Sequence, residues 1–440
     1  MKTPIRFLFT LLCAAIVSLP SIHASTFTVT NTGDNGGVNP SPGAGTGTLR
    51  QAIVDANANA GADMITFSAS VTGTIVLSSA LPNLSDDVII SGPGANVLTV
   101  QRSTAAGTPS FRIFTINSGK TVTISGLTIT NGNVDGGGIY NDHAILAVSN
   151  STLSGNSASL TGGGIYNNAF NGSATLTINN STLSGNSATT GGGGGIFNDG
   201  RFSGSATLTI VSTILNNLGG NISNFGTVIS KGWNLSSDDA SALLNQSTDQ
   251  NSTDPKLGPL RDNGGPTFTR GLFTGSPATD KGSNPLFLLF DQRGPGFPRT
   301  DGDETDVGAF EGVQPLVCPQ GQGYWKNNPA AWPVTSLVLG GKTYTKTQLL
   351  KILMTPIGSG PKADASLILA DQLIAAKLSI ANGTDGTPVT STIMNADSLL
   401  TGHPVGSHVK PSSSTGQAMI NDANVLDNFN NGLLTLGCGL

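Results

Sequence analysis

Apolar and small polar residues alternate in the middle of the chain, in a phrase that returns four times as TVTIS, ILAVS, TLTIN and TLTIV. Alternation with a period of two predicts short strands with one buried face. One apolar position of the phrase is held in turn by Val122, Leu146, Leu176 and Leu208. The steps between them are 24, 30 and 32 residues, which predicts a solenoid whose units bury their apolar faces by stacking.

Two further phrases run in phase with the first. GGGIYN fills 136–141 and 162–167 and returns as GGGIFN at 193–198, while NSTLSGNSA fills 150–158 and 180–188. Three short strands per unit, joined by glycine-rich corners, predict a mainly β fold of the parallel β-helix type. A β-propeller is the alternative, but its blades usually need about 40 residues and four strands.

Asparagines return at fixed places in these phrases. Equivalent positions are held by Asn141, Asn167 and Asn198, and in another phrase by Asn156 and Asn186. Stacked side-chain amides can satisfy one another and the turn backbone, so we expect a structural ladder beside the apolar one. A ligand-binding role is the alternative. Ser184 is expected on an outer turn.

The chain divides into five predicted parts. Residues 1–24 form a signal peptide, because Lys2 and Arg6 precede an apolar run over 7–17, too short to cross a bilayer, and Ala24 is small. Next come an N-terminal cap over 25–65 with a helix over 49–57, and a parallel β-helix over 66–250. A Gly/Pro-rich region over 251–314 is expected to close the last coil. Residues 315–440 carry helical patterns near 345, over 363–383 and over 416–429.

Composition and the cysteines bear on the surroundings of the protein. Charged residues make up 11% of the chain and the net charge is −5. Because the sequence has no basic patch and no second apolar span, nucleic acid and membrane are poor partners, and no transmembrane segment remains after signal removal. Cys318 and Cys438 bracket the last part and are expected to pair in an exported protein; two free thiols are the alternative.

Two aspartates are the candidates for catalysis. Asp142 and Asp199 follow equivalent phrases two units apart, with His143 and Arg201 nearby. Their expected separation of about 10 Å is borderline for an inverting glycosidase pair. The coils over 113–231 contain no Glu and three Asp, too few for the acidic clusters that β-helix lyases and hydrolases use. Solvated turn aspartates are therefore the favoured interpretation.

Other candidates are weaker. Asp301, Asp303 and Asp306 lie in a possible calcium loop, although Asp306 occupies the position of the turn glycine and Gly312 that of the closing Glu. A solvated acidic turn is the alternative, and we expect no cofactor otherwise. His403 and His408 could bind a metal, but the sequence shows no further ligand, so two solvated loop histidines are expected. The aromatic residues Tyr324, Trp325 and Trp332 suit a domain core better than a sugar platform.

These phrases resemble a group of bacterial proteins. The GGGIYN and STLSGNSA repeats are similar to secreted polymorphic outer-membrane and right-handed β-helix proteins. TLRQAI at 48 resembles the start of the CSLREA group, without its cysteine and glutamate. RDNGGPT at 261 and DVGAFE at 306 resemble the choice-of-anchor Q region, and GYWKNNPAAWP at 323 is similar to an uncharacterised C-terminal module of secreted proteins. The resemblance implies a right-handed helix and a secreted or cell-surface location, and carries over no catalytic residues.

The expected function is non-catalytic: adhesion, surface display or contact with a cell-surface glycan or protein along the solenoid. A polysaccharide hydrolase or lyase using Asp142 and Asp199 is one alternative. In the other, the solenoid is a spacer that presents a C-terminal binding domain.

Overall fold

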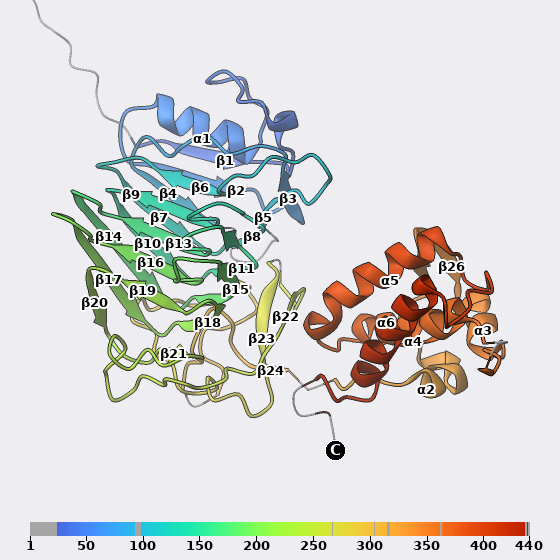
Figure 1. Ribbon diagram of the computed structural model, residues 1–440. Helices are drawn as coiled ribbons and strands as arrows, with labels where there is room; N and C mark the ends of the chain where they lie inside the picture. The colour runs from blue at the N-terminus through green and yellow to red at the C-terminus, as the bar shows by residue number, and fades with distance from the viewer. Residues whose placement is uncertain are drawn as a thin grey trace, which may run out of the picture.

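The structure is a computed structural model that describes residues 24–92, 98–265, 267–302, 304–314, 317–360, 363–435 and 438. A mainly β body is followed by a helical region (Figure 1). The predicted signal peptide lies outside the described residues except for Ala24.

Three sheets of parallel strands build the body. Sheet A contains β1 (Thr26–Val29), β2 (Asp63–Phe67), β4 (Val88–Ser91), β7 (Thr121–Ser125), β10 (Ile145–Ser149), β14 (Ser173–Asn179), β17 (Ser205–Val211) and β20 (Thr227–Ser230). Sheet B contains β3 (Thr74–Leu77), β5 (Thr99–Arg102), β8 (Thr128–Thr130), β11 (Thr152–Ser154), β12 (Ser157–Ala158), β15 (Thr182–Ala188), β18 (Ile214–Leu218) and β21 (Leu235–Ser236). Sheet C contains β6 (Phe114–Ile116), β9 (Ile139–Asp142), β13 (Ile165–Asn168), β16 (Ile196–Asp199) and β19 (Ile222–Asn224).

Equivalent positions of the repeats lie in register. Leu146 pairs with Val122 on one side and with Leu176 on the other, and Leu176 pairs with Leu208. All four are buried in an apolar cluster that collects the inward side chains of all three sheets. Each unit thus buries its apolar face against the next, an arrangement compatible with a parallel β-helix solenoid.

The first open end of the core is covered by helix α1 (Leu49–Ala58), which begins where the Thr48 side chain accepts the N–H of Gln51. Its buried Arg50 pairs with Asp34 at 2.7 Å. At the other end, Ala240 and Leu244 join the same apolar cluster. The loop around these two residues therefore packs against this end of the core, while Leu235 of the last unit packs against Ala278 and Val307 of the Gly/Pro-rich region.

The Gly/Pro-rich residues 254–311, here called the covering segment, instead pack on the outer face of sheet B. An outward column of threonines, Thr128, Thr152 and Thr182, meets them. Thr152 donates a hydrogen bond to the side chain of Gln292, which in turn donates to Thr128 at 2.8 Å. The covering segment contributes the strands β22 (Leu257–Arg261) and β23 (Thr269–Phe273), which form a small sheet with β24 (Val313–Gln314).

This cover explains why one expectation is wrong. Ser184 lies in β15 and is 2% exposed, so it is no outer-turn residue. On the same face, Arg270 of β23 donates to the hydroxyl of Ser154, and its guanidinium lies beside Gly185. The outward face of sheet B is therefore an internal interface.

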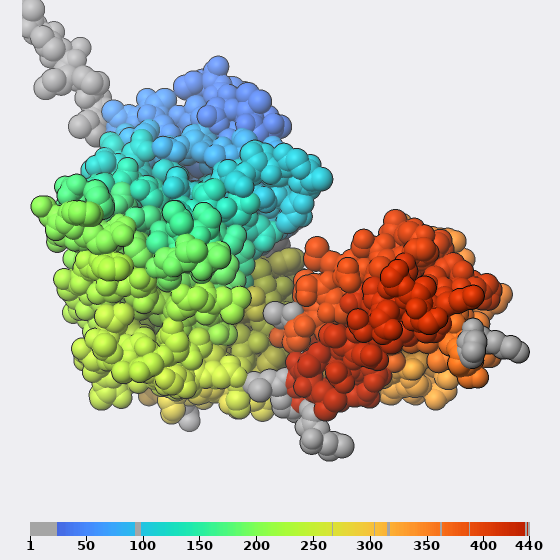
Figure 2. All heavy atoms as spheres, in the orientation of Figure 1, coloured from blue at the N-terminus to red at the C-terminus, as the bar shows by residue number. Residues whose placement is uncertain are grey.

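The helical region has its own apolar core. Its elements are α2 (Gln322–Asn327), the hairpin β25 (Ser336–Leu339) and β26 (Lys342–Thr345), α3 (Lys346–Met354), α4 (Ala365–Ala381), α5 (Thr390–Gly402) and α6 (Ser414–Asn430). In the space-filling view it meets the covering segment on one flank of the sheets (Figure 2), where Arg261 donates to the carbonyl of Gly383 at 2.9 Å. Among the described residues, no helix is both long and apolar enough to span a membrane.

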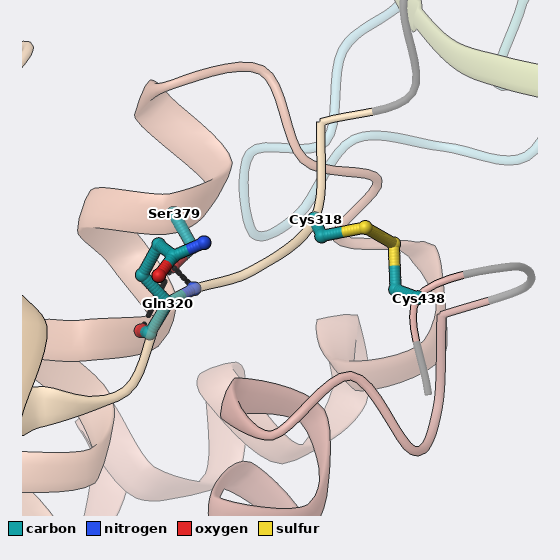
Figure 3. The surroundings of a disulfide bond; sticks show 4 residues. All are labelled: Cys318, Gln320, Ser379 and Cys438. Atoms are coloured by element: carbon teal, nitrogen blue, oxygen red, sulfur yellow. Dashed lines mark hydrogen bonds between the residues drawn. A yellow bond between two sulfur atoms is a disulfide. The ribbon is translucent and has the colours of Figure 1, made fainter. Parts of the chain in front are cut away.

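Cys318 and Cys438 form a disulfide across the limits of this region, with their Cα atoms 5.4 Å apart. Beside it, the Ser379 hydroxyl of α4 bonds both the N–H and the carbonyl of Gln320 (Figure 3). A disulfide fits a protein of an oxidising, extracellular environment.

Candidate functional site: the outer face of sheet C

The outward side chains of β9, β13 and β16 form two columns that follow the parallel register. The first column contains Tyr140, Tyr166 and Phe197. The second contains Asp142, Asn168 and Asp199. Alternation along each strand produces this arrangement, since the residues between them point into the core. We call these columns and their adjoining turns the sheet C flank.

The aromatic column is continuous from unit to unit. Tyr140 lies 5.1 Å from Tyr166, and Tyr166 lies 5.1 Å from Phe197, measured between ring centroids. Both contacts are edge-to-face, a favourable geometry for aromatic pairs. Arg112 lies over the Tyr140 ring at 4.2 Å, so a cation covers the first ring of the column.

Hydrogen bonds tie the two columns together across units. The Asn168 amide donates to Asp142 at 2.8 Å and to the hydroxyl of Tyr140 at 2.9 Å. The Tyr166 hydroxyl donates to Asp199 at 2.7 Å. Burial and then the Asp199 carboxylate raise the pKa of Tyr166, so this phenol stays a donor.

Asp199 is buried and accepts four hydrogen bonds, one from Tyr166 and three from Arg201. Arg201 binds it through two side-chain hydrogen bonds of 2.7 and 2.9 Å and one from its backbone N–H. Burial alone would raise the pKa of Asp199, but the hydrogen bonds from Arg201 and Tyr166 outweigh it and lower the pKa. An ionised, saturated carboxylate of this kind suits a structural role better than proton transfer.

Asp142 is held by its neighbour. The His143 ring nitrogen Nδ1 lies 2.6 Å from Asp142 Oδ1, and Nε2 lies 2.9 Å from the carbonyl oxygen of Phe170. The hydrogen bond to Phe170 and the pairing with Asp142 raise the pKa of His143, although partial burial opposes them. Asp142 and Asp199 are separated by two strand spacings, about 10 Å, with Asn168 between them.

The turns that leave sheet C add exposed rings. Phe202 is 79% exposed and packs against Phe170, with ring centroids 4.6 Å apart. Its φ is 62°, a left-handed conformation that costs a bulky residue free energy. The equivalent residue one unit earlier is Asn171, with a φ of 58°. The turn therefore suits Asn, and an exposed Phe there is a strained exception.

The asparagine ladder lies inside, directly behind the flank. The Asn141 amide donates to Asn167, Asn167 to Asn198 and Asn198 to Asn224, each at 2.7 Å. A second ladder runs from Asn156 to Asn186 at 2.9 Å and on to Asn217 at 2.7 Å. These buried amides are occupied by one another and offer little to a ligand.

The acidic loop of the covering segment does not assemble a cation site from its described residues. Asp301 is exposed, whereas both carboxylate oxygens of Asp306 accept backbone N–H groups, from Asp280 and Gly312. Asp303 lies outside the described residues. Within the described ranges, no three His, Cys, Asp or Glu side chains form a cluster that could hold a metal.

The remaining candidates lie in the helical region. His403 is exposed, and His408 is 91% exposed at its side chain and 3.8 Å from Asp364. Trp325 and Trp332 are buried in the helical core, where the Trp332 indole donates to the carbonyl of Trp325 at 2.8 Å. They are core residues and cannot form a sugar platform, and Tyr324 alone of the three is exposed.

Sequence reasoning singled out Asp142 and Asp199 but missed the aromatic column, Arg112 and Phe202. The column was visible as the alternating aromatic position of the GGGIYN phrase. Asn168 pairs with Asp199, and extending this pairing by three residues aligns Phe202 with Asn171, so the position of Phe202 could have been found from the sequence. No protein-family model matches the chain, and neither a curated protein nor a solved structure shows significant similarity to it.

Proposed function

We propose that this is a secreted or cell-surface right-handed parallel β-helix protein that binds glycans without catalysis. The sheet C flank is the binding surface, and the resemblance to polymorphic outer-membrane and choice-of-anchor Q proteins supports the location. The observation that carries the proposal is the cross-linked double column of aromatic and polar side chains, bordered by the strained, exposed Phe202.

The chemistry of the flank suits sugars. Aromatic rings pack against the C–H faces of pyranoses, while carboxylates and guanidinium groups bond their hydroxyls. Arg201 lies 5.3 Å from the centroids of the buried Phe197 and of Phe225, which is 51% exposed, and its own side chain is 42% exposed, so a guanidinium edge lies beside one accessible ring. Repetition across units favours an extended glycan over a compact ligand.

A matched pair of variants tests the proposal. Phe202→Asn copies Asn171 of the preceding unit, so it removes the ring while favouring the turn, and stability should stay level or rise by about 1 kcal/mol. Binding of the full-length protein to immobilised cell-surface polysaccharide should weaken about tenfold or more. Phe287→Asn removes another exposed aromatic with positive φ, far from the flank in sequence, and should bind as wild type. Equal binding by wild type and Phe202→Asn would rule the flank out.

The rival is a polysaccharide hydrolase or lyase using Asp142 and Asp199. The saturation of Asp199 by Arg201 and Tyr166 argues against it. Product analysis on neutral and acidic glycans, with and without calcium, should give no new reducing ends and no unsaturated sugars. A glycan-cleaving activity that disappears in Asp142→Asn or Asp199→Asn would show that the protein is an enzyme and would overturn the proposal of binding without catalysis.

The other alternative makes the body a spacer for the helical region. A protein ending at Gln314 should keep its glycan binding if the flank carries it. Loss of binding in this truncated form, with the parallel sheets intact, would move the function to residues 315–440.

A further inference from the structure

A second surface stands out at the end of the body remote from α1. A pocket of about 830 Å³ opens there, within the range of about 300–1,000 Å³ that is typical of small-ligand sites. Its walls come from two places in the chain: the last corner with the following turn, and the 277–284 and 304–305 stretches of the covering segment.

Trp233 forms the apolar wall, and its backbone is unusual. The corners between sheets A and B recur in register, and each has a positive φ at Gly126, Asn150, Asn180, Ser212 and Trp233. Backbone hydrogen bonds show that these corners are equivalent. The N–H of Asn180 donates to the carbonyl of Val211, which precedes Ser212, and the N–H of Ser212 donates to the carbonyl of Gly232, which precedes Trp233. Glycine, asparagine and serine suit such a corner, whereas a bulky indole is strained in it.

The strain is held in place by the neighbouring turn. The Trp233 N–H donates to the Thr248 hydroxyl at 3.0 Å, and Asn234 donates to Asp249 from both its backbone and its side chain. Asp249 also accepts the Ser230 hydroxyl and the Gln246 N–H. The carboxylate of Asp249 is therefore saturated, although it lines the pocket. Strain that the surroundings enforce at an exposed aromatic is a mark of a functional position.

The opposite wall is equally well fixed. The backbone N–H of Asp280 donates to Asp306 at 2.8 Å, and that of Ser283 donates to the hydroxyl of Ser212 at 2.9 Å. Within the described part of the chain, the ammonium of Lys281 and the carboxylate of Glu304 form no ion pair and no hydrogen bond, and both are exposed in the pocket. The pocket is thus lined by the Lys281 ammonium, by the carboxylates of Glu304, Asp280 and the saturated Asp249, and by an indole that is 37% exposed.

We propose that this pocket binds a neutral saccharide, with a pyranose ring packed on the Trp233 indole and its hydroxyls bonded by Glu304 and Lys281. A hydroxyl can donate to the carboxylate and accept from the ammonium, so a neutral polyol satisfies both groups. An anionic ligand would meet the carboxylates of Glu304, Asp280 and Asp249, and a cationic ligand would meet the ammonium of Lys281. The site is independent of the sheet C flank, because the two share no residue.

Intrinsic fluorescence can report on this site alone. The chain has three tryptophans, and Trp325 and Trp332 are buried in the helical core while Trp233 is 37% exposed. Titration of the full-length protein with cellotriose, mannotriose, chitotriose and maltotriose should shift or quench the Trp233 emission with at least one of them. Phe202→Asn should leave that change intact, which separates this site from the flank.

Trp233→Asn is the decisive variant, because it copies Asn150 and Asn180 at equivalent corners. In a Phe202→Asn background, Trp233→Asn should weaken binding of the active trisaccharide about tenfold or more, as measured by calorimetric titration. The unfolding temperature should stay level or rise. Glu304→Gln should weaken binding and preserve the fold. Three results would each overturn the proposal: no trisaccharide binds at millimolar concentration, Trp233→Asn binds as before, or Trp233→Asn markedly lowers the unfolding temperature. The last result would make the indole a structural residue.

Discussion

Each inward position of the sheets is surrounded by its counterparts in the units before and after it. Leu176 is fully buried between Leu146 and Leu208, and Asn167 is fully buried between Asn141 and Asn198. A single substitution there disturbs two neighbouring units at once. Outward positions on the same strands differ from one face to another: the covering segment buries those of sheet B, whereas Tyr140 and Tyr166 of sheet C stay partly exposed.

Leu176→Asp should lower the free energy of unfolding by at least about 3 kcal/mol, because it buries an unpaired carboxylate. Denaturant unfolding of the full chain measures the loss. Thr177→Asp, one residue further on the same strand and half-buried on its outer side, is the control and should cost much less. Equal midpoints for the two variants would contradict the inward assignment of Leu176.

Asn167→Ala should lower the free energy of unfolding by about 2–4 kcal/mol, because it leaves the side-chain amide of Asn141 and the side-chain carbonyl oxygen of Asn198 without their ladder partners. Thermal or denaturant unfolding checks it. Asn245→Ala, at an exposed loop position, should be close to neutral. If Asn167→Ala were equally neutral, the ladder would contribute nothing to stability.

At the scale of elements, the repeats allowed the register to be predicted, because Leu146 and Leu176 occupy the same place in similar phrases. Helix α1 and the long helix α4 were predicted close to their bounds from apolar periodicity and capping residues. Helix α5 and the hairpin of β25 and β26 were missed, because their residues lack a clear period. The burial of Thr128, Thr152 and Thr182 under the covering segment could not be predicted from the neighbouring sequence, because their hydrogen-bond partners lie more than 100 residues away along the chain.

The covering segment contains a buried ionisable cluster. Burial raises the pKa of Glu311 to about 8; the Arg299 guanidinium opposes the shift and the Asp306 carboxylate adds to it. In an unfolded chain the pKa of Glu is about 4.3. Between these values the folded protein keeps a proton that the unfolded chain has lost, so stability falls as pH rises, by up to about 1.4 kcal/mol per unit.

Glu311→Gln should remove this contribution, because it mimics the protonated side chain. Relative to wild type, the variant should gain stability steadily from about pH 5 to about pH 8. Denaturant unfolding at several pH values gives the difference, which cancels the contributions of other groups such as Asp371. Glu304→Gln, at an exposed site in the same segment, should follow the wild-type curve. Parallel curves for Glu311→Gln and wild type would show that Glu311 is ionised in the folded protein.

At the scale of the whole molecule, two apolar cores stand side by side, one within the parallel sheets and one within the helices. The two cores share no residue, and the helical region meets the covering segment through contacts such as the hydrogen bond from Arg261 to Gly383. The two cores should therefore unfold separately. The candidate site could be predicted only in part. Asp142 and Asp199 could be picked out because each follows the same repeated sequence phrase, but the hydrogen bonds that hold them come from other units as well as from their neighbours in sequence.

Removing the disulfide with Cys318→Ser and Cys438→Ser should destabilise the helical region by up to about 4–5 kcal/mol in the chain-entropy model. The unfolding of the parallel sheets should be unchanged. Circular dichroism during thermal unfolding can follow helix and strand signals separately. A common shift of both transitions would contradict the separation of the two cores.

The disulfide also determines how tension would travel through the molecule. Cys318 and Cys438 enclose helices α2 to α6, so a pull applied to the chain beyond Cys438 would cross directly to Cys318 through the sulfur–sulfur bond. The helices would lie outside the load path and carry none of the force, which would pass on toward β24 and the covering segment. Mechanical strength under such a pull would be that of the stacked strands and a covalent bond.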